Sequence, residues 1–127
     1  MITETIRMST DQQTLIPLRD VLALFEPNNW RWTVEAFDGF GRFPADITWA
    51  EFLDIVNAEA AVFDWNGILR FADGVVQMID GRIVATDENG ARVVKIDALD
   101  STEYEVVIDP AWSDVSAFVS RVAAAQW

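Results

Sequence analysis

The stretch IVATDENGARVVKID, residues 83–97, decides the fold. Its central Asn89-Gly90 dipeptide is typical of two-residue β-hairpin turns, because both central residues of a type I′ turn need positive φ. A turn at this point creates two apolar cross-strand pairs, Ala85 with Val94 and Ile83 with Ile96. Since strand side chains alternate between faces, the residues between them point the other way. The stretch therefore predicts an antiparallel hairpin with one buried face.

Toward the N-terminus, three more turn-type dipeptides recur every seven residues: Asn66-Gly67, Asp73-Gly74 and Asp80-Gly81. As tight turns they predict an antiparallel meander of short strands from Ala61 to Ile108. The resulting register contains four further apolar pairs, Phe71 with Val76, Leu69 with Met78, Met78 with Ile83 and Val76 with Ala85. The opposite face is mixed and includes Arg82, Val84, Thr86 and Lys95. Because a slip of one residue would destroy this separation, the pattern favours a sheet with one buried face.

The residues before the meander predict two helices and one strand. Pro17–Pro27 has apolar residues at helical spacing and predicts a short helix that begins at one proline and ends before the other. Trp30–Phe37 alternates apolar and polar residues and predicts a strand, whereas Asp38–Asp46 contains two glycines and a proline and predicts a loop. Thr48 and Glu51 form a capping box that opens a second helix.

The two ends of the chain complete the predicted fold. Glu103–Ile108 is the last predicted strand, and Asp109-Pro110 opens a C-terminal helix as its cap and first residue. Residues 1–13 lack periodicity and form either a frayed arm or an added edge strand. The predicted fold class is α+β, an antiparallel β-meander sheet with two to three helices packed mainly on one face. We expect a single globular domain over residues 1–127.

The composition excludes several kinds of chemistry. The chain has 127 residues, of which 21 are acidic and 9 basic, and it contains neither histidine nor cysteine. Disulfides, thiolate nucleophiles, Cys/His zinc sites and Ser-His-Asp triads are therefore excluded. The formal charge of -12 disfavours binding to nucleic-acid phosphates. No apolar run predicts a transmembrane helix or an export signal, so we expect a cytoplasmic protein with no membrane association.

Carboxylates are the remaining candidates for catalysis or metal binding. The candidates for general acid–base chemistry are Glu35 with Asp38, and Asp64. Asp64 precedes a predicted turn, and bonding to local backbone amides explains it better than catalysis. Asp97, Asp100 and Glu103 could surround a hard cation, but they do not match the calcium-loop pattern. We therefore expect no enzymatic activity, no metal and no cofactor.

Acidic and aromatic side chains are the candidates for partner binding. The acidic candidates crowd the region after the hairpin: Asp97, Asp100, Glu103 and Glu105. The predicted register places Phe63 opposite Arg70 and Trp65 opposite Ile68 on the mixed face, and Phe40 and Phe43 flank Arg42 in the predicted loop. Exposed aromatic residues beside arginine are typical of interface anchors. The alternative is that a helix or the N-terminal arm covers these rings.

These features favour a small acidic protein-binding inhibitor that blocks a basic partner. The hairpin at residues 83–97, which leads into an Ile-Asp strand end, is similar in style to strands of bacterial immunity proteins. Such proteins neutralise cognate toxins of contact-dependent, type VI or related secretion systems. The resemblance implies that the partner is a toxin domain, for example a basic nuclease. We expect the inhibitor to be a monomer or a weak homodimer.

Two other classes of protein stay open. A carbohydrate or small-ligand domain could use Phe63, Trp65 and nearby carboxylates. A structural or accessory subunit could instead pair its uncovered sheet face with copies of itself. Glycan binding would support the first class and a stable homo-oligomer the second, whereas salt-sensitive binding to a toxin would support the inhibitor.

Overall fold

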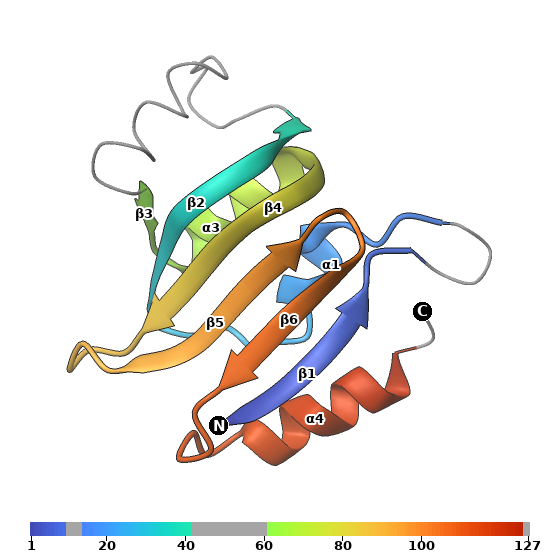
Figure 1. Cartoon of the computed structure of the whole chain (residues 1–127). Helices are drawn as coiled ribbons and strands as arrows, with labels where there is room; N and C mark the ends of the chain where they lie inside the picture. Colours follow the sequence, from blue (N-terminus) through green and yellow to red (C-terminus); the bar gives the residue numbers. More distant parts are fainter. Residues whose placement is uncertain (10–13, 42–60, 126–127) are drawn as a thin grey trace.

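The computed structural model describes residues 1–9, 14–41 and 61–125 and has the predicted α+β fold (Figure 1). Its six strands form one antiparallel sheet in the order β1-β6-β5-β4-β2-β3. The strands are β1 (Ile2–Arg7), β2 (Arg31–Gly41), β3 (Ala61–Phe63), β4 (Val75–Thr86), β5 (Arg92–Leu99) and β6 (Glu103–Ile108). The helices in the described part are α1 (Leu18–Leu22), α3 (Trp65–Gly74) and α4 (Val115–Ala124).

The hydrophobic core lies on one side of the sheet. In Figure 1, α1 and α3 lie behind the strands, and α4 runs alongside β1. Phe118 of α4 is fully buried and stacks on Phe25, which follows α1, with 4.6 Å between ring centroids. Phe25 in turn contacts Trp32 of β2, so all three described helices belong to a single core. No helix in the described residues covers the opposite face of the sheet.

The hairpin that decides the fold is confirmed with its register. β4 and β5 pair with Ala85 opposite Val94 and Ile83 opposite Ile96, and all four residues are fully buried. The connecting loop is closed by Asp87, whose side chain accepts hydrogen bonds from the backbone N–H groups of residues 89 and 91, each at 2.9 Å. The Asn89-Gly90 dipeptide lies in the hairpin connection as predicted, but it does not form a two-residue type I′ turn. Of the two residues only Gly90 has positive φ, and its N–H donates a 3.0 Å hydrogen bond to the Asp87 carbonyl oxygen.

The predicted turns at Asn66-Gly67 and Asp73-Gly74 are wrong, because residues 65–74 form α3. The side chain of Asp64 accepts a 2.7 Å hydrogen bond from the Gly67 N–H and caps this helix. The buried residues Ile68, Phe71 and Ala72 have helical spacing. The cross-strand pairs Phe71 with Val76 and Leu69 with Met78 do not form, since Phe71 and Leu69 lie on a helix.

The predicted turn at Asp80-Gly81 is also wrong, because both residues lie inside the long strand β4. β4 pairs with β2 along its length, so the expected pairs Met78 with Ile83 and Val76 with Ala85 are absent. β2 continues to Gly41, which corrects the loop predicted from Asp38. A Cβ on Gly39 would lie 2.2 Å from the Gln77 carbonyl oxygen, so glycine permits this close backbone approach. Residues 42–60, with the predicted second helix, lie outside the described part.

The ends of the chain follow the prediction in part. β1 pairs with β6 at the edge of the sheet, so the edge-strand alternative for residues 1–13 is confirmed over Ile2–Arg7. The predicted strand Glu103–Ile108 is confirmed as β6. The C-terminal helix begins at Val115 rather than at Pro110. The Asp109 side chain accepts a hydrogen bond from the Ala111 N–H instead, which forms a local turn before α4.

Tyr104 of β6 fastens the segment before α1 to the sheet. Its side chain is 1% exposed, and its hydroxyl donates a 3.1 Å hydrogen bond to the Ile16 carbonyl oxygen. Burial raises the pKa of Tyr104 above its ordinary value, and the nearby Asp20 charge raises it further. The neutral phenol is therefore the form that the folded protein holds.

We expect the protein to lose stability above about pH 10, where an unfolded chain releases the tyrosine proton and the folded chain does not. The loss should approach about 1.4 kcal/mol per pH unit until Tyr104 ionises in the folded state. The Tyr104→Phe variant should remove this slope and should cost about 1–3 kcal/mol at neutral pH, because the Ile16 carbonyl loses its partner. Urea unfolding from pH 8 to 11 measures both effects. Since Tyr104 is the single tyrosine, tyrosinate absorbance in the folded protein near pH 10 would contradict the prediction.

Candidate functional site

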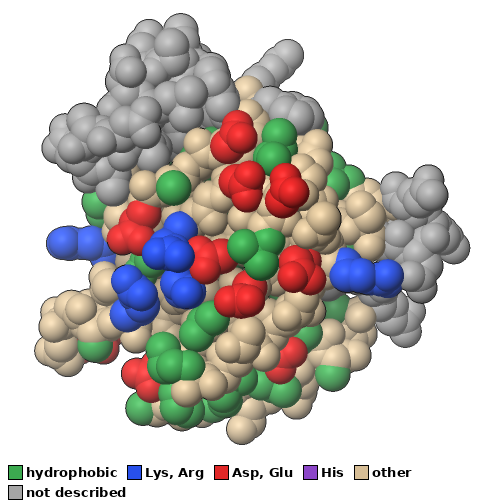
Figure 2. All heavy atoms as spheres, viewed as in Figure 1, with side chains coloured by type: hydrophobic (Ala, Val, Ile, Leu, Met, Phe, Trp, Pro, Cys, Tyr) green, Lys and Arg blue, Asp and Glu red, His purple; other side chains and the backbone are tan. Residues whose placement is uncertain are grey.

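The side of the sheet away from the core, called the open face here, carries a mixed set of side chains (Figure 2). Strand alternation and the pairing register place the following residues on it: Thr3, Thr5, Arg7, Arg31, Thr33, Asp80, Arg82, Val84, Thr86, Lys95, Asp97, Leu99, Glu103, Glu105 and Val107. Figure 2 shows acidic side chains gathered over its centre and upper part and basic ones mostly to the left. The open face is thus polar but unevenly charged.

A three-residue ion network occupies the centre of the open face. Arg82 of β4 lies directly opposite Asp97 of β5, and its Nε donates a 2.8 Å hydrogen bond to Asp97 Oδ1. The Lys95 Nζ lies 3.3 Å from Asp97 Oδ2. The hydrogen bond to Asp97, the charge of Asp97 and the charge of Glu35 raise the pKa of Arg82. Because two cations already satisfy Asp97, this predicted site residue stabilises the sheet and has little capacity left for a partner.

Acidic side chains gather at the end of the open face where β5 turns into β6. We call this region the acidic end; it consists of Asp80, Leu99, Asp100, Glu103 and Glu105. The Asp100 N–H donates a 2.9 Å hydrogen bond to Asp80 Oδ1, and the Ser101 N–H donates one of the same length to the Ile79 carbonyl. Asp100 and Ser101 both have positive φ, of 50° and 62°. These contacts hold the strained turn against β4.

The acidic end combines three predicted residues with one that the sequence did not reveal. Asp100, Glu103 and Glu105 were all expected to bind a partner, and they lie together here. Asp80 was not predicted as a site residue, because the Asp80-Gly81 dipeptide is typical of a turn. The pairing of β4 with β2 shows that both residues lie within a strand. Leu99 stands at the same end with 36% of its surface exposed. An apolar side chain within a charged rim is a common anatomy of protein interfaces.

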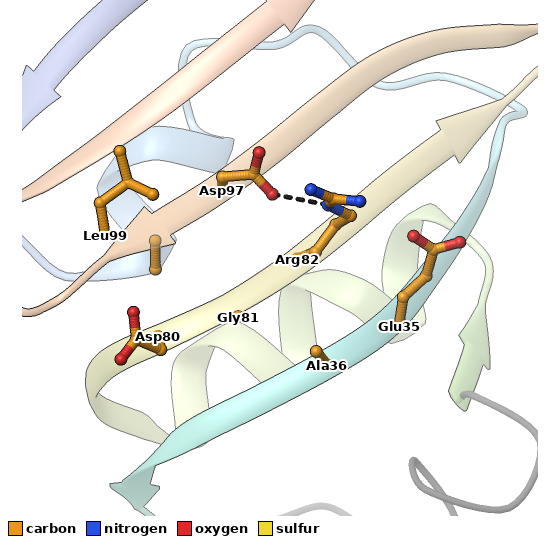
Figure 3. A pocket seen from close by; sticks show the side chains of 8 residues that line it. Glu35, Ala36, Asp80, Gly81, Arg82, Asp97 and Leu99 are labelled. Atoms are coloured by element: carbon orange, nitrogen blue, oxygen red, sulfur yellow. Dashed lines mark hydrogen bonds and ion pairs between the residues drawn. The ribbon is translucent and has the colours of Figure 1, made fainter.

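A hollow of about 450 Å³ opens on the face between β2, β4 and β5 (Figure 3). In Figure 3 the Arg82 side chain lies between Asp97 and Glu35, while Asp80 and Leu99 occupy the other end. Glu35 has no partner in the β2–β4 register, which is irregular between Val34 and Ala36. A bulge of this kind bends the strand and redirects a side chain. The hollow is wide and shallow, which suits a protein surface better than an enclosed metabolite.

The predicted aromatic anchors lie elsewhere. Phe63 is opposite Trp32 rather than Arg70, and its ring stacks on Phe71 with 5.6 Å between centroids. Trp65 begins α3, and its ring lies 5.6 Å from that of Trp32. Both side chains are half-buried against the core, so they do not lie on the mixed face where the predicted register placed them.

The remaining predicted anchors do not reach the acidic end or lie outside the described part. Arg70 is exposed on α3, on the core side of the sheet. Phe40 belongs to the end of β2, but its side chain is outside the described part, as are Arg42 and Phe43 entirely. Of the predicted site residues that the structure describes with their side chains, the acidic ones, Asp97, Asp100, Glu103 and Glu105, lie together on the open face.

In the described part of the chain, the carboxylate Asp64 has a structural role. Asp64 caps α3, as the simpler interpretation of that residue expected. Within the described residues, no three carboxylates are placed to hold a metal ion. None of the helices in this part of the chain is long and apolar enough to cross a membrane.

The chain matches no protein-family model, no curated protein sequence and no solved structure. The geometry of the open face is therefore the main basis for a functional proposal.

Replacing the α3 cap with Asp64→Ala is expected to lower the free energy of unfolding by about 1 kcal/mol, because the Gly67 N–H loses its acceptor. Asp64→Asn should cost little, since asparagine caps helices as well as aspartate does. Chemical denaturation of the three proteins measures the difference. Equal losses in both variants would show that charge, and not capping, is the contribution of Asp64.

Removing the centre of the ion network with Asp97→Ala is expected to cost about 1–2 kcal/mol, because Arg82 and Lys95 then lose their shared carboxylate. The matched control Asp100→Asn removes an exposed negative charge from the same face and should change stability by less than about 0.5 kcal/mol. A double-mutant cycle between Asp97→Ala and Arg82→Ala measures the interaction free energy between these two side chains. Additive losses would contradict a coupled network.

Proposed function

We propose that the protein is an acidic protein-binding inhibitor of the immunity-protein class, which binds a basic toxin domain through the acidic end of its open face. The observation that carries this proposal is the position of Leu99 among Asp80, Asp100, Glu103 and Glu105 on a sheet face that no described helix covers. The resemblance of residues 83–97 to strands of immunity proteins supports a toxin domain as the class of partner.

Charge and rigidity support this surface as a binding site. Four carboxylates at one end of the face attract a basic partner and raise its association rate. The bonds from Asp100 to Asp80 and from Ser101 to Ile79 hold the turn in place before binding. A surface that is already ordered loses less conformational entropy when a partner docks. Leu99 supplies the apolar contact at the centre.

The chemistry of inhibition follows from the charge of the target. A nuclease binds phosphates in a basic groove, and a row of fixed carboxylates presents similar negative charge to that groove. The inhibitor would then cover the groove and exclude the substrate. The absence of imidazole and thiol from the chain is compatible with such a blocking role.

The alternative functions have less support. The carbohydrate-binding alternative relied on Phe63 and Trp65, and both rings pack against the core. A subunit that pairs its open face with copies of itself would have to bring together two faces with several carboxylates each, which costs electrostatic free energy.

The test is to identify a secreted toxin domain encoded beside this gene and to measure its binding by calorimetry at about 50 and 300 mM NaCl. We expect affinity to fall steeply with salt, since exposed charges are screened. Glu103→Lys/Glu105→Lys should weaken binding by about tenfold or more, and Leu99→Ala by about the same factor. The control Glu26→Lys/Glu88→Lys makes the same change in net charge away from the acidic end and should keep most of the affinity.

Two results would count against the proposal in different ways. If the chain neither binds nor inhibits the neighbouring toxin, the proposed function is overturned. If it inhibits the toxin but Glu103→Lys/Glu105→Lys binds as tightly as the control, the function stands and the acidic end is the wrong surface. Circular dichroism of each variant excludes unfolding as the cause of lost binding.

A further inference from the structure

A second hollow lies at the opposite end of the strands, where the β4–β5 hairpin meets the segment between β6 and α4. Its volume is about 300 Å³, and its lining includes Trp30, Asp87, Val93, Asp109, Trp112 and Ser113. This hollow is far along the sheet from the acidic end, which β5 and β6 form at their other termini. Nothing in the proposed function uses it.

Two indole rings form one side of the hollow. Trp30 and Trp112 lie edge to face, with 5.2 Å between ring centroids and an interplanar angle of 74°. Phe25 packs against both rings from the core, at 6.3 Å and 5.9 Å, and holds them in place. Trp30 is 9% exposed and Trp112 is half-buried, so the rings are fixed by packing and still reach the surface.

Two carboxylates line the same hollow, and local hydrogen bonds orient each of them. Asp87 Oδ1 accepts from the N–H groups of Asn89 and Ala91, and Asp109 Oδ1 accepts from the N–H of Ala111. The lining contains no lysine or arginine. A neighbouring hollow shares Asp87 and includes Arg31 and Glu88, whose charges offset each other. The local charge of the Trp30–Trp112 hollow is therefore negative.

We infer that this hollow binds a small organic cation, an ammonium or guanidinium group, between the two indoles and the carboxylates of Asp87 and Asp109. Tryptophan is the best aromatic partner for a cation, because its ring face carries negative electrostatic potential. Two nearby negative charges favour a cation over a neutral ligand of the same size. The cation could be a free molecule or the side chain of a lysine or arginine in a protein.

The probe is tetramethylammonium chloride, with tert-butanol as a neutral molecule of similar shape and NaCl at equal ionic strength. Binding is followed by the indole N–H signals of Trp30 and Trp112 in heteronuclear NMR spectra, assigned with single tryptophan-to-phenylalanine variants. We expect saturable shifts of these two signals with tetramethylammonium and none with tert-butanol or NaCl. Equal responses to all three compounds, or no response to any, would overturn the inference.

The double variant Asp87→Asn/Asp109→Asn keeps the side-chain oxygens that accept the turn hydrogen bonds and removes both charges. It should weaken tetramethylammonium binding by about tenfold. The control Asp38→Asn/Asp64→Asn removes the same net charge at exposed residues outside the hollow and the acidic end, and it should keep the affinity. Equal loss of affinity in both double variants would show that tetramethylammonium binding depends on the net charge of the protein, and it would contradict the proposed site.

A further arm identifies the source of the cation. A short peptide with one trimethyl-lysine is compared with free tetramethylammonium, on the wild-type protein and on the Asp87→Asn/Asp109→Asn variant. Tighter binding of the peptide, lost in the variant, supports a protein side chain as the ligand. Equal binding supports a free cation. Because no toxin is present, failure here leaves the proposed function untouched, and success does not depend on it.

Discussion

The structure depends on the burial of one face of an antiparallel sheet. The ladder residues Ile83, Ala85, Val94, Ile96 and Val106 are fully buried and meet the helices on one side. Burial of apolar area is the main favourable contribution to folding, and a sheet can supply it with a single face. The residues between them in sequence must then face away from the core. The polar chemistry of this protein is a direct consequence of that alternation.

On the open face, positive and negative charges are paired in the centre, whereas negative charge is in excess at one end. Asp97 is only 9% exposed and shares its carboxylate with Arg82 and Lys95. A carboxylate this close to the sheet surface would be costly without partners. At the β5–β6 turn, Arg7 of β1 lies opposite Glu103, and among the described residues Asp80, Asp100, Glu103 and Glu105 outnumber it, so the local charge stays negative. The contrast separates a structural ion network from a surface suited to a partner.

Turn-type dipeptides were the main source of error in predicting this fold. Asn89-Gly90 forms a hairpin turn, but Asn66-Gly67 lies in the first turn of α3 and Asp80-Gly81 lies within β4. The positions of Ile68, Phe71 and Ala72 fit both a short strand and the apolar stripe of a helix. Over so short a segment, hydrophobic periodicity does not distinguish a strand from a helix. In the structure the segment is a helix, and the Asp64 side chain caps its N-terminus. The carboxylates of the acidic end were predictable from their crowding in sequence, except Asp80, which the mistaken turn concealed.

The sequence by itself determined the fold class, the register of the central hairpin and the chemistry that the chain lacks, because alternation, an Asn-Gly turn and residue composition are local properties. Only the tertiary structure decided which strands are neighbours, where Phe63 and Trp65 lie and which carboxylates stand together. Those outcomes depend on contacts between residues far apart in sequence, such as Asp80 with Asp100 and Trp30 with Trp112. A linear pattern does not contain them, since they arise from how β2 and the helices pack against the same hairpin.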